Sequence, residues 1–242
     1  MSDKILLTET GDSIKAENAN WSFGGNVPKN FDEHVKKSVP FYEAGHDLVG
    51  KISDYFLSDG SYCYELGCST AKLTKNLAER HKLKKINFVG IDKEKGMITK
   101  AKKLCKENKN VKIIYSDLGK IKYQKSDLFI SFYTIQFVHP KIRQLIFNDI
   151  YNSLNWGGAF ILFEKVRAND ARFQDIFTTL YTDYKLSQGF TPEEILSKSR
   201  SLKGVLEPFS EQGNIDLLKR AGFVDITIVF KYICFEGFLA IK

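Results

Sequence analysis

Residues 62–71, Tyr62-Cys63-Tyr64-Glu65-Leu66-Gly67-Cys68-Ser69-Thr70-Ala71, decide the fold. A short apolar run ends at Gly67, which permits a tight turn, and small residues follow it where a helix can start against the strand. Similar apolar runs come at 86–91, 111–115, 128–132 and 159–163, with a helical pattern between each run and the next. Strands that alternate with helices predict right-handed crossovers and a mainly parallel sheet that is covered on both faces.

Three segments lie outside this alternation. Apolar residues at helical spacing predict two helices between Phe31 and Phe56, broken near Pro40, after an irregular arm over residues 1–30. Residues 168–206 are helical and amphipathic, and we expect them to form a cap over the sheet. A helix at 215–221 and strands at 225–230 and 234–241 predict an antiparallel closure of one sheet edge. We therefore expect a single α/β domain over residues 1–242, with an N-terminal helical arm at 1–57.

Composition excludes several classes of protein. The chain has 242 residues and a net charge of +7. Because 43% of the residues are hydrophobic, it can bury a sizeable core and is not disordered. No stretch approaches the roughly 20 apolar residues that cross a bilayer, and the start of the chain is polar, so we expect a cytoplasmic protein without a membrane segment. The four cysteines form no Cys-x-x-Cys pair and the histidines are scattered, which argues against a metal site.

Lysines crowd residues 82–125, which raises the possibility of an RNA-binding surface. They fall on the solvent side of a predicted helix, and no aromatic residues alternate with them to stack bases. We therefore expect no direct nucleic-acid binding.

Acidic residues stand at the ends of three successive predicted strands. Glu65 ends the first, Asp92 the second, and Asp117 follows the third. Asp92 follows Gly67 at about the interval that places a carboxylate on a ribose diol. An acid at Asp117 can accept a hydrogen bond from the amine of adenine. Together these acids predict a nucleoside-binding site.

A dinucleotide-dependent oxidoreductase has the same strand-end geometry. The turn after Leu66, however, keeps only one glycine, Gly67, and lacks the others that let a pyrophosphate approach a helix N-terminus. The acid at Glu65 would repel a diphosphate and suits a cationic ligand. S-adenosylmethionine (SAM), which carries an ammonium, a sulfonium and no phosphate, is such a ligand.

With these features the chain resembles the class I SAM-dependent methyltransferases, which have a Rossmann-like fold. More narrowly, it resembles the carboxy-S-adenosylmethionine (carboxy-SAM) synthases, which supply the carboxymethyl donor for wobble-uridine modification in tRNA. The resemblance runs from about Phe31 to the C-terminus. It is carried by Phe31-Asp32-Glu33, Ser38-Val39-Pro40-x-Tyr42, Leu66-Gly67-Cys68-Ser69, Ile91-Asp92, Gln136-Phe137, Leu154-Asn155-x-Gly157-Gly158-Ala159, Glu164-Lys165 and Ala221-Gly222-Phe223.

The resemblance implies a set of cofactor-binding residues, a second substrate and an oligomeric state. The residues that would line the pocket for SAM or its carboxylated derivative are Tyr42, Gly67, Cys68, Ser69, Asp92, Lys93, Asp117 and Leu118. Glu65 and Phe132 complete the expected pocket. Prephenate would be the second substrate of a synthase, and a homodimer is expected because the synthase family is dimeric.

Candidate catalytic groups follow the fourth and fifth predicted strands. Tyr133 and His139 follow the fourth, and Glu164 follows the fifth. A histidine is the usual general base near neutral pH, although His139-Pro140 can equally cap the next helix. The cap offers three candidate substrate-binding residues, Tyr181, Tyr184 and Arg200.

Two positions depart from the synthase pattern. In that family an arginine on the cap pairs with the added carboxylate and an asparagine assists, but this sequence has Ser199 and Phe132 there, with Arg200 one residue away. A buried carboxylate without a cation is costly, which favours ordinary SAM and methyl transfer to a small molecule. The alternatives are a carboxy-SAM synthase, with Arg200 restored by a one-residue shift, and a non-catalytic SAM-binding subunit.

Overall fold

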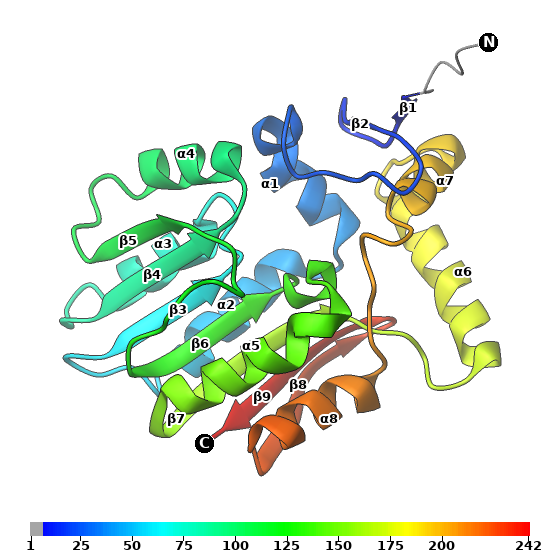
Figure 1. The fold of residues 1–242 in the computed structure, drawn as a ribbon. Coiled ribbons are helices and arrows are strands. Elements are labelled where there is room, and N and C mark those ends of the chain that lie inside the picture. The colour runs from blue at the N-terminus through cyan, green and yellow to red at the C-terminus, as the bar shows by residue number, and fades with distance from the viewer. Residues whose placement is uncertain (1–6) are drawn as a thin grey trace.

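The computed structural model describes residues 7–242, and its centre is a seven-stranded sheet in the order β5-β4-β3-β6-β7-β9-β8 (Figure 1). In chain order its strands are β3 (Tyr62–Leu66), β4 (Asn87–Asp92), β5 (Val111–Tyr115), β6 (Ser126–Phe132), β7 (Leu154–Lys165), β8 (Asp225–Tyr232) and β9 (Phe235–Ile241). The first five run parallel, and β9 lies antiparallel between β7 and β8. The predicted Rossmann-like fold with an antiparallel C-terminal edge is confirmed.

The chain changes direction across the sheet beside β3. It passes from β3 to β4 and β5 on one side and then returns to β6 on the other side of β3. Ligands of open α/β sheets bind outside the carboxyl ends of the strands at such a reversal. The strands predicted at 62–66 and 111–115 have exactly these bounds. β7 begins five residues before the predicted 159, because Leu154 already pairs with Ser126 of β6.

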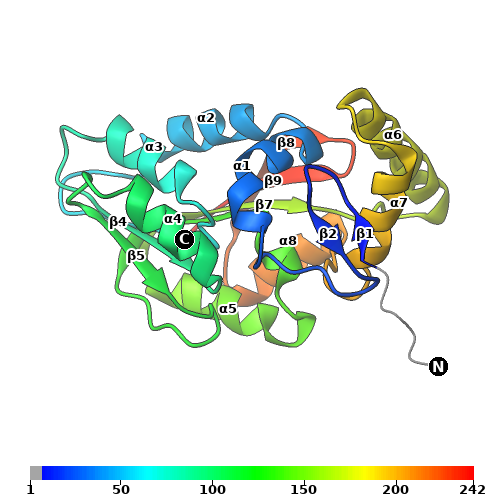
Figure 2. The same cartoon turned by 90° about the horizontal axis from the view of Figure 1, so that it is seen from above.

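Helices cover both faces of the sheet (Figures 1 and 2). On one face lie α2 (Tyr42–Ser53), α3 (Lys72–Arg80) and α4 (Lys95–Leu104), and on the other lie α5 (Pro140–Ser153) and α8 (Glu211–Ala221). Alternate residues of each strand point to opposite faces. Cys63 therefore packs with Val49 of α2, whereas the neighbouring Tyr64 belongs to the cluster that contains Phe147 of α5.

The N-terminal arm is more regular than expected. A hairpin of β1 (Thr8–Glu9) and β2 (Lys15–Ala16) comes first, and α1 (Val27–Ser38) begins inside the segment predicted to be irregular. Pro28 lies in the first turn of α1, where its missing N–H costs nothing, so it favours the start of this helix. The predicted break near Pro40 is confirmed, since α1 ends at Ser38 and α2 begins at Tyr42.

The segment after β7 forms two helices, α6 (Ala171–Ser187) and α7 (Pro192–Ser201), which lie beyond the carboxyl ends of the strands (Figure 1). The N-terminus of α7 has a capping box between Thr191 and Glu194. The hairpin contacts α7, so the arm and the α6–α7 segment meet over the same end of the sheet. No helix within residues 7–242 combines the length and apolar character needed to cross a membrane.

Candidate active site

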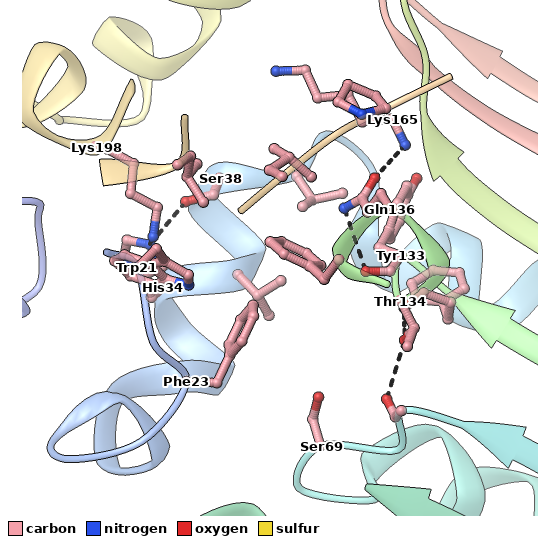
Figure 3. Close-up of a pocket in the computed structure, with 18 of the residues that line it drawn as sticks. Trp21, Phe23, His34, Ser38, Ser69, Tyr133, Thr134, Gln136, Lys165 and Lys198 are labelled. Carbon is pink, nitrogen blue, oxygen red and sulfur yellow. Dashed lines mark hydrogen bonds between the residues drawn. The ribbon is translucent and has the colours of Figure 1, made fainter. Parts of the chain in front are cut away.

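A cavity of about 960 Å³ lies where the arm and the α6–α7 segment face the carboxyl ends of β3, β4, β6 and β7 (Figure 3). Pockets for small molecules have volumes up to about this size, so it has room for a nucleoside cofactor and a second small molecule. Its wall includes most of the residues that the sequence predicts for a site. These are Tyr42, Glu65, Gly67, Cys68, Ser69, Asp92, Lys93, Asp117, Leu118, Phe132, Tyr133, His139 and Tyr181.

The turn after β3 brings its backbone to the cavity. Gly67, Ser69 and Ala71 all have positive φ angles, of 74°, 49° and 62°. The N–H groups of Gly67 and Cys68 both donate to the Ile91 carbonyl, at 2.8 and 2.9 Å, which joins the turn to the end of β4. A Cβ on Gly67 would lie 2.3 Å from Thr134 Oγ1, so both the backbone angle and the space require glycine here.

Asp92, at the end of β4, is oriented by the backbone around it. Its Oδ2 accepts from the Ser69 N–H at 2.9 Å and its Oδ1 accepts from the Glu94 N–H at 2.8 Å. A carboxylate oxygen has two lone pairs, so each oxygen can accept one more hydrogen bond from a pair of hydroxyls. Burial raises the pKa of Asp92 above its ordinary value, and the two N–H donors counter this rise.

Asp117, which follows β5, is more exposed to solvent than Asp92. Asp117 is exposed, and its Oδ1 accepts from the Gly119 N–H at 2.8 Å, which leaves Oδ2 available. Leu118 is buried and offers an apolar surface to a flat ring. Lys93 lines the cavity with an exposed side chain. This part of the wall therefore offers one further hydrogen-bond acceptor beside an apolar side chain.

Glu65 is a buried acid in the cavity wall. Burial raises the pKa of its carboxyl to about 8, and the hydroxyl of Thr74, which donates to it, opposes this rise. No lysine, arginine or histidine of residues 7–242 forms an ion pair with it. A buried acid with no cationic partner fits the ammonium group of a ligand.

Aromatic side chains form the wall beside Glu65. The Phe132 ring lies 5.3 Å from that of Tyr42 and 4.8 Å from those of His46 and Tyr133, measured between centroids. Gly45 of α2 makes room for it, since a Cβ there would lie 2.8 Å from Phe132 Cζ. Burial raises the pKa of the Tyr42 phenol, so this hydroxyl stays protonated. Phe132 thus fills its place with an apolar ring and offers no hydrogen bond.

The three candidate catalytic residues have different settings. Tyr133 lines the cavity, and burial holds the pKa of its phenol well above its usual value, which makes it a hydrogen-bond donor rather than a base. His139 caps α5, with its Nδ1 accepting from the Lys141 N–H at 3.2 Å. Glu164 is not part of the cavity wall. It is buried against the Ile135–Gln136 backbone, and burial raises its pKa to about 8 although the nearby charge of Arg143 acts against the rise.

Two predicted substrate residues do not reach the cavity. Tyr184 stacks on Tyr181, with centroids 6.4 Å apart, and lies behind it. Arg200 is exposed and outside the wall, and its carbonyl accepts from the Ala19 N–H at 2.9 Å. On α7, both Lys198 and Ser199 line the cavity. Two residues beyond Lys198 the side chain has turned by about 200°, which takes Arg200 to the other side of the helix.

Sequence reasoning assigned no site role to three lysines of the wall. Lys165 ends β7, Lys185 lies on α6 and Lys198 lies on α7, and all three line the cavity (Figure 3 labels Lys165 and Lys198). It also missed Trp21 of the arm, whose ring lies under the Lys198 ammonium. The only signal was the Glu164-Lys165 pair, because a lysine on an amphipathic helix ordinarily faces water.

Comparison with known proteins identifies the family of this chain. A family model described as a methyltransferase domain matches residues 64–158. A carboxy-SAM synthase of Staphylococcus epidermidis is 37% identical over 223 residues, which cover 92% of this chain and 97% of that protein. One of Sulfurimonas denitrificans is 35% identical over the whole of both chains.

Solved structures agree on the fold. A putative SAM-dependent methyltransferase from Methanococcus maripaludis superposes with a TM-score of 0.61 at 18% identity, covering 92% of this chain and 95% of that one. A putative O-methyltransferase from Nostoc punctiforme gives 0.63 at 12% identity, covering 90% and 60%. The chain is therefore a SAM-dependent transferase of the class I methyltransferase superfamily and belongs to the carboxy-SAM synthase family.

Proposed function

We propose that this protein is a carboxy-SAM synthase that uses SAM and prephenate. The observation that carries the proposal is the similarity to carboxy-SAM synthases at about 35% identity along nearly the full chain, cap included. This similarity favours the synthase over methyl transfer to a small-molecule acceptor, which the sequence alone favoured. The cavity has room for both substrates, and its lysines suit a second substrate that carries two carboxylates.

The residues at the strand ends would hold SAM. Asp92 accepts the ribose hydroxyls, and Asp117 accepts from the adenine amine while Leu118 packs against the ring. Glu65 faces the ammonium of the methionine portion, which favours its ionised form. The Tyr42 ring encloses that portion from the side of α2. Gly67, Cys68, Ser69 and Lys93 complete the wall around the nucleoside.

The reaction balances without a permanent proton acceptor on the protein. The ring carboxylate of prephenate replaces one hydrogen of the sulfonium methyl group. That hydrogen leaves as water with the ring hydroxyl, and prephenate becomes phenylpyruvate. The side chains then need to orient two substrates and exclude water, which are large contributions to rate. Tyr133 serves as a protonated donor within the cavity, and His139 is not required as a base.

Methyl transfer to a small molecule is the second candidate, because Phe132 and Ser199 stand where the synthases have an asparagine and an arginine. Incubation with SAM and prephenate, followed by mass spectrometry of the nucleosides, separates these functions. The synthase yields a product heavier than SAM by one carbon dioxide, whereas a methyltransferase yields S-adenosylhomocysteine only when its acceptor is present. A non-catalytic subunit yields neither.

We also propose that the protein is a homodimer whose product serves the wobble-uridine modification of tRNA, as its family implies. The exposed apolar residues Phe173, Ile176 and Leu180 of α6 offer a surface for a second copy. Light scattering on the purified protein measures the oligomeric state directly, and a monomer at micromolar concentration contradicts this part of the proposal.

A further inference from the structure

Three lysines of the cavity wall have no anionic partner. Lys165, Lys185 and Lys198 come from β7, α6 and α7, and they belong to the same cavity. Across residues 7–242 none of them appears in an ion pair with a carboxylate within 4.0 Å. Surface lysines normally extend into water, so three of them pointing into one largely buried space form an unusual concentration of positive charge.

One aromatic ring, that of Tyr181, contacts two of these lysines. The Nζ atoms of Lys165 and Lys185 lie 4.3 and 4.6 Å from the centroid of the Tyr181 ring. The Tyr181 hydroxyl donates to the Ser38 carbonyl at 2.8 Å, which ties this part of α6 to the end of α1. A cation over a ring gains some attraction but remains charged, so the need for an anion persists.

The lysines also repel one another. The pKa of Lys185 is lowered to about 8, by burial first and then by the charge of Lys165. Burial likewise holds the pKa of Lys198 well below its usual value, with the charge of Lys185 as the next cause. A bound dianion would relieve both the burial cost and this repulsion, so an anionic ligand stabilises this arrangement.

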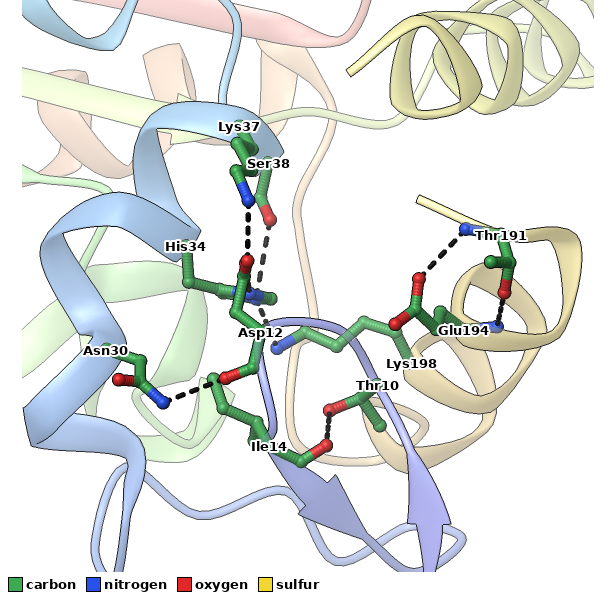
Figure 4. A network of polar contacts seen from close by, with 10 residues as sticks. All are labelled: Thr10, Asp12, Ile14, Asn30, His34, Lys37, Ser38, Thr191, Glu194 and Lys198. Carbon is green, nitrogen blue, oxygen red and sulfur yellow. Dashed lines mark hydrogen bonds and ion pairs between the residues drawn. The ribbon is translucent and has the colours of Figure 1, made fainter. Parts of the chain in front are cut away.

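A chain of hydrogen bonds positions Lys198 without neutralising it (Figure 4). Asp12 Oδ2 lies 2.8 Å from His34 Nδ1, which leaves His34 Nε2 as the acceptor that faces Lys198 Nζ at 3.3 Å. The pKa of His34 is lowered to about 4 by burial first and then by the charge of Lys198, so the ring is neutral. The charge of Asp12 is balanced by Lys37, whose Nζ lies 2.6 Å from its other oxygen. His34 is thus a positioning residue that accepts a hydrogen bond from Lys198, and no carboxylate of residues 7–242 forms an ion pair with this lysine.

We propose that Lys165, Lys185 and Lys198 form a carboxylate-binding subsite that takes the two carboxylates of prephenate, in place of the arginine whose position Ser199 occupies. This inference rests on the proposed function and names the residues that recognise its second substrate. It also accounts for the loss of the arginine, since Arg200 lies outside the cavity and cannot replace it. The positive charge that the carboxylates require comes from lysines on β7, α6 and α7 instead of from one arginine.

The test measures prephenate binding separately from turnover. Calorimetry titrates prephenate into the full-length protein saturated with S-adenosylhomocysteine, which lacks the methyl group and so permits no reaction. The variants are Lys185→Met, Lys198→Met and Lys198→Arg, and the control is Lys219→Met, which removes an equal charge from an exposed position on α8. We expect each methionine variant at the subsite to weaken prephenate binding by roughly 10- to 100-fold. Lys198→Arg and Lys219→Met should stay within a few-fold of the wild type.

We expect the affinity for S-adenosylhomocysteine to remain unchanged in all variants. This control establishes that each variant is folded. Formation of carboxy-SAM by the wild type tests the proposed function independently. If the wild type makes carboxy-SAM while both methionine variants bind prephenate normally, the subsite is wrong and the function stands. If the wild type neither makes carboxy-SAM nor binds prephenate, both are wrong. If the methionine variants lose prephenate binding and the wild type makes no carboxy-SAM, the subsite stands and the reaction is a different one.

Discussion

Each carboxylate oxygen of Asp92 accepts one backbone N–H and can accept one more hydrogen bond, from a ribose hydroxyl. We predict that Asp92→Ala weakens SAM binding by at least about tenfold, because each charge-assisted bond to a ribose hydroxyl contributes about 1.5–3 kcal/mol. Calorimetry with S-adenosylhomocysteine measures the effect. Asp59→Ala is a suitable control, since Asp59 Oδ1 also accepts a backbone N–H, that of Lys85 at 2.7 Å, and does not line the cavity. Equal affinity in the two variants would remove Asp92 from the cofactor site.

Lys185 should make prephenate binding depend on pH. It is faced by Lys165 of β7, Lys198 of α7, Cys234 before β9 and Tyr181 of its own helix. Its pKa is lowered to about 8, mainly by burial. A bound carboxylate favours the ammonium form and raises this pKa, so binding takes up a proton above about pH 8, and affinity falls as the pH rises through this value.

Calorimetry in the presence of S-adenosylhomocysteine, from about pH 7 to about pH 9.5, measures this dependence. Lys185→Arg should abolish most of the decline, because a guanidinium stays charged throughout this range. A wild-type affinity that is flat over the range would exclude Lys185 from the ligand.

Single residues also show where sequence reasoning stops. The roles expected of Gly67 and Asp92 follow from local geometry at a strand end, and the structure places both at the cavity. Arg200 and Lys198 differ by two positions on one helix, so choosing between them requires the rotation of α7 about its axis. That rotation depends on the packing of α7 against the hairpin, which is a contact between distant parts of the chain.

At the scale of elements, α6 and α7 are the part of the structure best suited to move. No residue of α6 is fully buried, and Tyr181 and Lys185 are half-buried on its cavity side, whereas the central strands of the sheet lie in the core. We predict that this segment opens and closes, and that S-adenosylhomocysteine together with prephenate protects it from limited proteolysis by closing it over the cavity. Cleavage after Lys185 or Arg172 should slow by about tenfold or more with both ligands. Cutting at the same rate with and without ligands would indicate a rigid cap.

The elements themselves were predictable to different degrees. Val111–Tyr115 could be identified to the residue because it is a short run of β-branched and aromatic side chains between polar loops. The start of α1 was missed because Pro28 reads as a breaker, although proline is favoured in the first turn of a helix. The β1–β2 hairpin, with two residues in each strand, has no periodicity that a sequence could show.

At the scale of the whole molecule, the cavity is assembled from the arm, the strand ends and the α6–α7 segment. Trp21, His34, Phe132, Lys165 and Lys198 meet there from five separate parts of the chain. This arrangement explains why the wall residues at the ends of successive strands, such as Gly67 and Asp92, could be predicted to lie together, and why the lysines from β7, α6 and α7 could not.

In the proposed reaction, the ring carboxylate of prephenate is transferred to SAM in this cavity. The most direct measurement uses prephenate labelled with ¹³C in the ring carboxylate, incubated with SAM and the wild-type protein, with mass spectrometry of the nucleoside product. We expect a carboxylated SAM that carries the label, together with an equal amount of phenylpyruvate. Unlabelled SAM recovered unchanged, with no phenylpyruvate above a control without protein, would contradict it.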